Sequence, residues 1–385
     1  MYVVSHECLE SGNQAGVRCG GVTVLNKAPQ FSQLRPVEAP CACVADPNPV
    51  TSAYVPEWQL PPAGYIEHGP VLSRIYDRLL NYGAYNFSAD RQAARDLLAA
   101  VPWAALVTWL TRAFMWRAIT YLVEQGVDQF ADIGSGIPTF GPTHEMLRTT
   151  MPNARVVYLD CDPVAVLQGQ QLLADIPTAS MAQANLCRPD TIIDQLRKDG
   201  VDLARPVGLL LGNVLACLAD RHAYRAVAAL HAVVAPGSWM ALTHITPRIC
   251  AGLPAGAGDA ADEVLRRTPT PMRVRDRAGV GRFFTGGWRL VEPGLVDAAT
   301  WRPDPHEAED WVYQIPVDAV LAGVARSASS NDMARPATVH TDTPEEDQTG
   351  RHPADSGISP VPSATPGRDE QRCRRQHPRS TQSMT

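Results

Sequence analysis

The sequence predicts an α/β fold in which a parallel β-sheet carries helices on both faces. Three observations support this prediction. Short apolar runs alternate with helix-length segments from residue 129 to residue 244, the first run closes on Asp132, Gly134 and Gly136, and the second closes on Asp160. Because parallel strands are joined by helical crossovers, this alternation requires a sheet that is covered on both sides.

A group of helices is expected in front of the first strand. Residues 70–80 and 88–100 have helical character, and Pro102 opens a longer helix that ends at Gly126. Proline is favoured in the first turn of a helix and glycine just past its end. An apolar stripe at helical spacing runs along the long helix, which is therefore expected to pack against the sheet.

The elements of the sheet follow in order along the chain. Their boundaries are set by short apolar runs for strands and by amphipathic segments for helices. Two later apolar runs have no long helix between them, so they are expected to pair antiparallel. The parallel strands are expected at 129–133, 155–160, 179–184, 206–212 and 238–244, the helices from about 141 and at 163–174, 189–198 and 220–234, and the antiparallel pair at 288–291 and 320–325.

The two glycines after the first strand predict a turn that faces a ligand. Glycine at 134 and 136 permits positive φ and leaves no Cβ between the backbone and the ligand. In the dinucleotide pattern G-x-G-x-x-G, a third glycine would stand where this chain has Thr139, and an apolar residue would replace Asp132. The Asp132 carboxylate repels a pyrophosphate but suits an ammonium group, such as the amino-acid end of S-adenosylmethionine (SAM).

The acid at the end of the second strand agrees with the same ligand. Asp160 is placed to accept hydrogen bonds from two ribose hydroxyls. Two other interpretations stay open at this point. In one the glycines only make a turn and Asp132 caps a helix; in the other the site binds NAD, which Thr139 and Asp132 disfavour.

Composition divides the chain into one folded domain and two extensions. Residues 1–61 lack sustained periodicity, and residues 327–385 are rich in Pro, Ser, Thr, Asp and Arg. Both are expected to be disordered. One folded domain is expected over 62–326, with a helical segment at 62–126 and an α/β core at 127–326.

Charge and hydropathy restrict the partners. The net charge is −6, and the basic residues near 372–375 form the single short cluster, which argues against nucleic acid as the main partner. No window of about 18 apolar residues is present, so neither a membrane span nor a secretory leader is expected and the protein is predicted to be cytoplasmic. The nine cysteines show no compact metal-binding spacing, and no metal is assigned.

Several motifs, in order along the chain, resemble one family of SAM-dependent methyltransferases. This family is abundant in actinobacteria and was long classed as a domain of unknown function. The resemblance covers about residues 64–326. The motifs are Pro70-x-x-Ser73-Arg74-Ile75-Tyr76-Asp77, Asn86-Phe87-Ser88-Ala89-Asp90-Arg91, Asp132-Ile133-Gly134-Ser135-Gly136-Ile137-Pro138-Thr139, Val157-Tyr158-Leu159-Asp160-Cys161-Asp162-Pro163, Ala235-Pro236-Gly237-Ser238, Leu290-Val291-Glu292-Pro293-Gly294-Leu295 and Trp301-Arg302-Pro303.

The resemblance implies a Rossmann-like class I methyltransferase with a terminal antiparallel strand pair and an N-terminal helical lid over the SAM site. Three positions depart from the family pattern. Tyr82 stands where a glycine is usual, Asn185 where an acid is usual, and Ala216 where a histidine is common. The leading hypothesis is methyl transfer to a small molecule, and the departures motivate an alternative, a non-catalytic SAM-binding regulatory or interaction protein.

Each candidate site residue has an expected role. The methionine end of SAM is assigned to Asp132, Gly134, Gly136 and Arg74, the last through the carboxylate. Tyr76 is expected in the lid, where an aromatic ring favours a cationic sulfonium. The ribose is assigned to Asp160 and Asp162, the adenine to Asn185, and a base, if the reaction uses one, to His244, for which a purely structural role is the competing interpretation.

Overall fold

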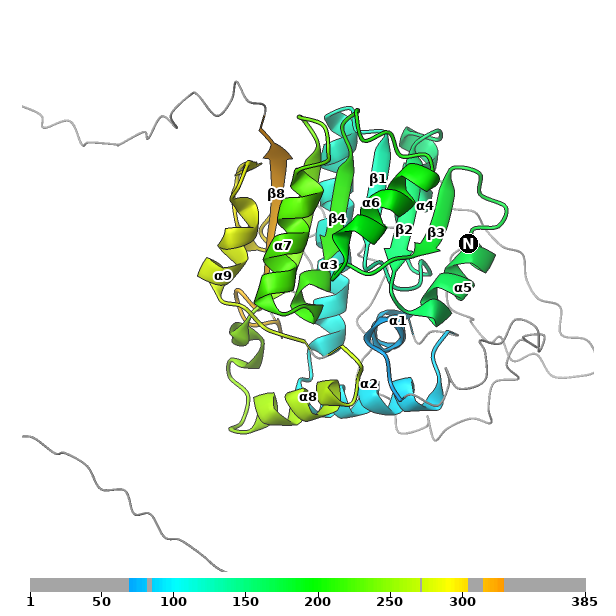
Figure 1. The fold of residues 1–385 in the computed structure, drawn as a ribbon. Coiled ribbons are helices and arrows are strands. Elements are labelled where there is room, and N and C mark those ends of the chain that lie inside the picture. The colour runs from blue at the N-terminus through cyan, green and yellow to red at the C-terminus, as the bar shows by residue number, and fades with distance from the viewer. Residues whose placement is uncertain (1–68, 82–84, 271, 304–313, 329–385) are drawn as a thin grey trace, which may run out of the picture. The chain divides into compact units, whose positions relative to one another are not determined.

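The computed structural model describes residues 69–81, 85–270, 272–303 and 314–328, and Figure 1 shows their arrangement. The predicted extension at 1–61, nearly all of the predicted tail at 327–385 and the departure at Tyr82 lie outside the described residues.

Three helices precede the sheet, as expected. They are α1 (Leu72–Asn81), α2 (Ser88–Ala100) and α3 (Ala104–Glu124). The long helix begins two residues after Pro102, because Pro102 and Trp103 form a turn. Apolar residues on most sides of α3 are buried, so this helix lies inside the protein and not on its surface.

Five parallel strands form the centre of the sheet in the order β3-β2-β1-β4-β5. The predicted alternation is confirmed, with boundaries that shift by a few residues. The strands are β1 (Gln129–Ile133), β2 (Arg155–Asp160), β3 (Ala179–Gln183), β4 (Gly208–Gly212) and β5 (Trp239–Ile245), and the helices between them are α4 (Thr143–Thr150), α5 (Pro163–Leu172), α6 (Pro189–Lys198) and α7 (Asp220–His231).

The antiparallel end of the sheet has a more specific order than the sequence predicts. β8 (Val320–Ser327) pairs with β6 (Trp288–Leu290), which confirms the predicted pairing. It also pairs with β5 along the whole length of that strand, so the last strand that the structure describes lies inside the sheet. Short β7 (Val296–Asp297) pairs with β8 as well. Nearly every residue of β8 is buried, as expected for a strand inside the sheet.

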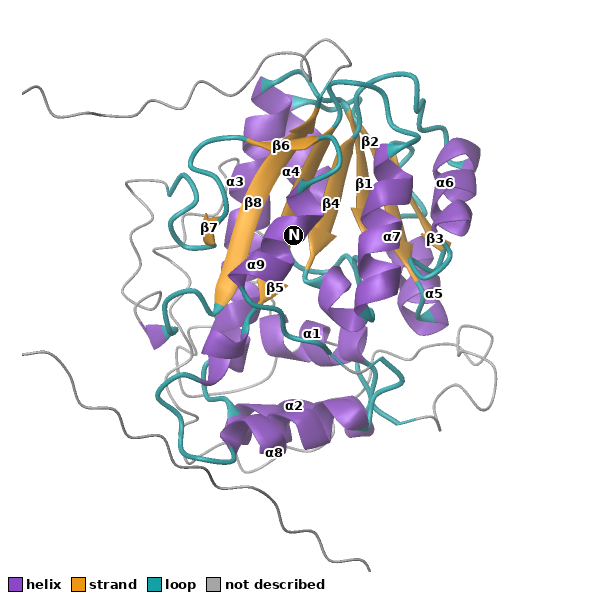
Figure 2. Ribbon diagram, turned by 60° about the vertical axis from the view of Figure 1, so that its left-hand side comes forward, coloured by secondary structure: helices purple, strands orange, loops and turns teal. Residues whose placement is uncertain are grey.

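Among the described residues, two helices and three 3₁₀ turns were not predicted. Figure 2 shows α8 beside α2 at the edge of the sheet where the parallel strands end. Both belong to a cap whose members come from distant parts of the chain. The additional elements are η3 (Val214–Cys217), η4 (Pro247–Cys250), α8 (Ala257–Arg266), α9 (Arg277–Gly281) and η5 (Arg282–Phe284).

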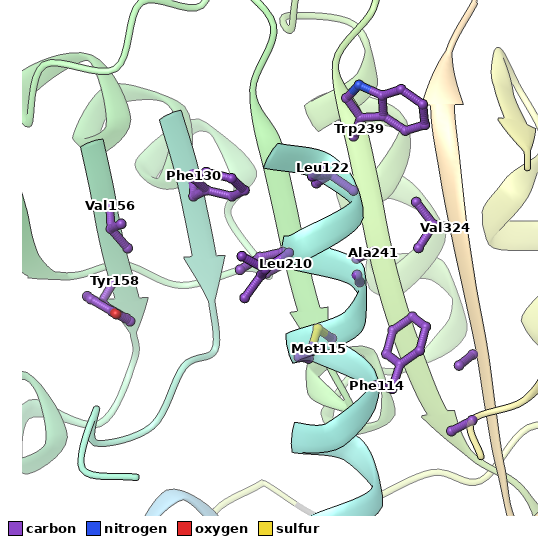
Figure 3. Close-up of a cluster of buried hydrophobic side chains, with 14 of the residues drawn as sticks. Phe114, Met115, Leu122, Phe130, Val156, Tyr158, Leu210, Trp239, Ala241 and Val324 are labelled. Atoms are coloured by element: carbon purple, nitrogen blue, oxygen red, sulfur yellow. The ribbon is translucent and has the colours of Figure 1, made fainter. Parts of the chain in front are cut away.

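Side chains that alternate along the strands divide the core into two layers. Phe130 of β1 and Leu210 of β4 point to the face covered by α3, whereas Leu209 and Leu211 point to the face covered by α6 and α7. Figure 3 shows the first layer, in which Phe114 of α3 lies among strand residues. Its ring centroid is 5.3 Å from that of Trp301 in an edge-to-face arrangement.

No single helix of the described ranges is long and apolar enough to cross a membrane; α2 and α3 would pass such a test only as a pair, and they meet at 100°.

Truncation of Phe114 is expected to destabilise the domain strongly. The side chain is fully buried at 0% exposure, so Phe114→Ala leaves a cavity between α3 and the sheet and costs about 3–5 kcal/mol of unfolding free energy. Val317→Ala, at a side chain 70% exposed, is the control and should change stability by less than about 0.5 kcal/mol. Urea unfolding measures both, and equal effects would contradict the assigned packing.

Candidate functional site

One cavity of about 430 Å³ lies where the parallel strands end and the cap covers them. Most of the predicted site residues line it, from four different elements. Those brought together are Tyr76, Asp132, Gly134, Gly136, Asp160, Asp162 and Asn185; Arg74 and His244 are not among the lining residues.

The glycine turn forms one wall of the cavity. Gly134 has φ +69° and Gly136 has φ +61°, a conformation in which a side chain is strained. A Cβ at Gly134 would lie 2.1 Å from the Val214 Cγ2 atom, so η3 packs directly against the turn. Gly134 therefore needs to be glycine for two independent reasons, backbone conformation and space.

Asp160 is held against this turn by backbone amides. Gly136 N–H donates to Oδ2 at 2.8 Å, and Asp162 N–H donates to Oδ1 at 2.9 Å. Burial raises the pKa of Asp160 to about 6, although these hydrogen bonds act in the opposite direction. Each carboxylate oxygen keeps a lone pair beyond its amide partner, so the group can still accept from a ligand.

Asp132 lies at the end of β1, 8% exposed. The Thr143 hydroxyl donates to its Oδ2 atom at 3.2 Å. Burial raises the pKa of this carboxyl, and the Arg112 charge opposes that shift. The Asp132 carboxyl and the Arg112 guanidinium thus interact electrostatically at the wall where the strand meets the cavity.

Arg112 is a site residue that the sequence reasoning missed. It projects from the middle of α3 into the cavity lining, and its guanidinium carbon lies 5.7 Å from the centre of the Tyr76 ring. Its Nε atom is buried without a hydrogen-bond partner in the described part of the chain. A cation within a largely apolar helix was the available cue, because a buried charge requires a partner or a function.

Tyr76 takes the lid position expected of it. It lines the cavity from α1, and its hydroxyl donates to the Thr108 carbonyl at 3.2 Å, which ties α1 to α3. Burial raises the pKa of Tyr76, so the phenol stays neutral. Phe87, in the loop before α2, packs under the Arg74 guanidinium at 5.0 Å and does not line the cavity.

Arg74 is placed differently from its expected role as a ligand contact. It is 1% exposed and lies 3.4 Å from the Asp90 carboxylate and 3.8 Å from that of Asp162. The two buried acids draw the guanidinium into the base of the lid and away from the cavity. Arg74 therefore fastens α1 to α2 and α5.

Asp162 is occupied by the protein on both oxygens. Its Oδ1 accepts the Val164 N–H at 3.1 Å as the N-cap of α5, and its Oδ2 accepts the Ser73 hydroxyl at 2.8 Å. The residue lines the cavity, but its main contacts close the lid onto α5. Its expected ribose role is therefore weaker than that of Asp160.

Asn185 lines the cavity after β3 and also shapes its own turn. Its side-chain Oδ1 accepts the Cys187 N–H at 2.8 Å, a turn that an aspartate could make equally well. The exposed amide retains a second lone pair on Oδ1 and its two donors. The departure from the family acid thus preserves the local backbone geometry.

His244 lies away from the cavity with both ring nitrogens engaged. Arg275 donates to Nε2 at 2.8 Å, so Nδ1 carries the proton and donates to the Ile245 carbonyl at 2.7 Å. Burial lowers the pKa of the ring to about 4. The geometry agrees with the competing structural interpretation, because no nitrogen is left to take a proton from a substrate.

Within the described ranges, no group of three or more His, Cys, Asp or Glu side chains is arranged to hold a metal ion.

Comparison with known families identifies the chain. A family model described as S-adenosyl methyltransferase matches residues 66–328. The chain belongs to the S-adenosyl methyltransferase family. The resemblance inferred from the motifs is confirmed, and the protein is a SAM-dependent methyltransferase whose acceptor the family match does not specify.

Solved structures agree with this assignment. A Thermobifida fusca protein described as a methyltransferase is 32% identical with a TM-score of 0.61, and the match covers 70% of this chain and 99% of that one. A DUF574-family protein from Streptomyces avermitilis is 32% identical with a TM-score of 0.61, over 68% and 99% of the two chains.

A more distant relative was found in Mycolicibacterium smegmatis. This protein, named as an S-adenosyl-L-methionine-dependent methyltransferase, is 29% identical over 202 residues. The alignment spans 51% of this chain and 64% of the relative, less than two thirds of its length.

The buried Asp160 carboxyl is expected to make the ligand-free methyltransferase less stable as pH rises from about 4 to about 6. Its pKa is raised to about 6 in the folded protein from the ordinary value of 3.8, so the folded state holds the proton that the unfolded chain releases. This contribution is present below the unfolded pKa and lost above the folded one, and is on the order of 3 kcal/mol.

Urea unfolding at several pH values tests this expectation. Asp160→Asn should reduce the decline in unfolding free energy between about pH 4 and about pH 7, because the variant has no proton to lose at this position. A decline as steep in Asp160→Asn as in the parent protein would show that other groups produce it.

Proposed function

We propose that this cavity binds SAM and that the protein transfers its methyl group to a small-molecule acceptor. One observation carries the proposal: the carboxylates of Asp132 and Asp160 stand at the ends of adjacent strands, on either side of the glycine turn, in one cavity. Ligands of open α/β sheets bind at this edge. The backbone of the glycine turn can approach a ligand closely, and a carboxylate lies on each side of the turn. This arrangement suits a ligand with an ammonium group and a ribose diol.

The methionine end of SAM is assigned to Asp132 and Arg112. The Asp132 carboxylate receives the ammonium group, and the Arg112 guanidinium receives the carboxylate. Arg112 replaces Arg74 in this role, because Arg74 is already held by two acids. The unpartnered Nε of Arg112 is the feature of the protein that a carboxylate would satisfy.

The nucleoside end is assigned to the next two strands. Asp160 accepts hydrogen bonds from the ribose hydroxyls through the lone pairs that its amide partners leave free. Asn185 lies beyond β3, where the adenine ring would extend. Glycine at 136 keeps the backbone open here, since the nearest atom to an added Cβ is the Ser73 Cβ at 3.7 Å.

SAM supplies a methyl group on a positively charged sulfur. The acceptor atom bonds to the methyl carbon while the carbon–sulfur bond breaks, sulfur keeps the electron pair, and the acceptor releases a proton to solvent. The protein contributes position and exclusion of water, which α1 and α2 provide by covering the strand ends. The cavity volume of about 430 Å³ and the net charge of −6 favour a small molecule over nucleic acid as the acceptor.

S-adenosylhomocysteine (SAH), the demethylated product, is expected to stabilise the protein, whereas NAD is not. Saturation at about 100 times the dissociation constant adds about 2.7 kcal/mol to the unfolding free energy, which thermal unfolding detects as a raised Tm. The Asp132 carboxylate repels the pyrophosphate of NAD, so no shift is expected with that ligand. Stabilisation by NAD alone would overturn the proposed function.

Arg112→Gln is expected to weaken SAH binding without affecting 5′-methylthioadenosine, which lacks the amino-acid part. Loss of a hydrogen bond to a charged group should lower the SAH affinity by about tenfold or more. Asp160→Ala is the comparison variant and should weaken both ligands, since both carry the ribose. Calorimetric titration measures the affinities; equal losses for both ligands in Arg112→Gln would contradict the carboxylate assignment.

A further inference from the structure

We propose that the methyl acceptor is an uncharged, largely apolar molecule with one hydroxyl or amine group, and that this group donates a hydrogen bond to Asn213. The inference rests on the proposed function, because it assigns the part of the same cavity that SAM does not occupy. Three observations lead to it: the lining of the cavity away from the strand ends, the position of β4 in the sheet, and an unused acceptor atom on Asn213.

The part of the cavity beneath the cap is apolar. Its walls come from α1, α2, α3, η4 and α8, and among the described residues the one charged side chain that these walls add beyond Arg112 is the exposed Asp262 of α8. A charged acceptor would lose its hydration here without gaining a partner, whereas an apolar one gains by leaving water. Side chains that define this part are Leu79, Leu97, Val101, Val107, Ile249 and Ala261.

The order of the strands leaves the β4 side of the cavity free of the assigned SAM contacts. The assigned cofactor residues follow β1, β2 and β3, with the amino-acid end at β1 and the adenine at β3. β4 is the neighbour of β1 on the side away from β2. An acceptor that approaches the sulfur from the apolar part of the cavity therefore meets the residue that follows β4, which is Asn213.

Asn213 is held rigidly at this point. It is one of the few non-glycine residues with positive φ, at 57°, and its backbone N–H donates to the Thr243 hydroxyl at 3.0 Å. Its side-chain Nδ2 donates to the Thr111 hydroxyl of α3 at 2.8 Å, which fixes the plane of the amide. Asparagine tolerates the left-handed conformation better than most residues, so the backbone and the side chain are both accommodated.

The Oδ1 atom of this amide is an acceptor without a donor. It is buried in the wall of the cavity and has no hydrogen-bond partner among the described residues. A buried carbonyl oxygen without a partner is unfavourable, and a ligand that brings one donor removes this cost. Donation to Asn213 would also orient the acceptor, leaving a lone pair of its oxygen or nitrogen free to attack the methyl carbon.

The test is calorimetric titration of the SAH-saturated protein with three probes that share one ring system. 2-Naphthol is apolar and has one donor, 2-methoxynaphthalene has no donor, and 2-naphthoate is an anion. We expect 2-naphthol to bind about threefold to tenfold more tightly than the methoxy compound, as one neutral hydrogen bond allows. 2-Naphthoate should bind at least about tenfold more weakly than 2-naphthol, because its charge is desolvated.

Two variants test the two parts of the proposal, the hydrogen bond to Asn213 and the binding in the apolar part of the cavity. Asn213→Gly keeps the left-handed backbone and removes the acceptor, so 2-naphthol should lose its advantage over 2-methoxynaphthalene. Ala261→Phe fills the apolar part and should weaken every probe by about tenfold or more. Ala260→Phe is the matched control, since Ala260 is the exposed neighbour on α8 and should leave probe binding unchanged.

SAH affinity, measured for each protein, separates the failure of this inference from that of the proposed function. Absence of SAH binding to the parent protein would refute the proposed function. With SAH bound normally, the inference is overturned if 2-naphthol does not bind, if 2-naphthoate binds as tightly as 2-naphthol, if Asn213→Gly keeps the advantage of 2-naphthol, or if Ala261→Phe behaves like Ala260→Phe.

Discussion

The close approach of the glycine turn to its neighbours is the constraint on which the rest of the site depends. The amide of Gly134 donates to the Leu159 carbonyl at 2.7 Å, and that of Gly136 donates to Asp160 at 2.8 Å. These bonds join the ends of β1 and β2 and turn the Asp160 carboxylate toward the cavity. On the other side, Val214 packs where any side chain at Gly134 would clash. The turn thereby sets the positions of β2 and of η3 together.

Burial gives two arginines of the same region different functions. Arg74 has two acidic neighbours and fastens the lid, whereas the Nε of Arg112 has no hydrogen-bond partner in the described chain and Arg112 lies on the cavity wall. A charge removed from water needs compensation, so Arg112, which lines the cavity and forms no direct ion pair with an acid among the described residues, is the arginine suited to a ligand. The same reasoning distinguishes Asp160, which keeps accepting capacity, from Asp162, which is used by α1 and α5.

Much of the fold was predictable because its causes are local. Alternating apolar runs located all five parallel strands, and helical periodicity located the helices between them. The insertion of β8 between β5 and β6 was not predictable, since strand order depends on contacts between segments distant in sequence. Helix α8 was missed because it is polar and only ten residues long. Its role in the cap follows from its packing against α2. The predictable part of the site was its cofactor half.

The sequence by itself determined the family and the groups that surround the glycine turn. Asp132, Gly134, Gly136 and Asp160 are recognisable there because the backbone conformation and the charge they impose are properties of the residues and their spacing. Only the tertiary structure decided which polar groups remain available. Arg74 forms ion pairs with two buried acids and both ring nitrogens of His244 are engaged, whereas the Nε of Arg112 and the Oδ1 of Asn213 have no hydrogen-bond partner among the described residues. Availability depends on what other segments bring within hydrogen-bond distance, and that is a property of the packed molecule.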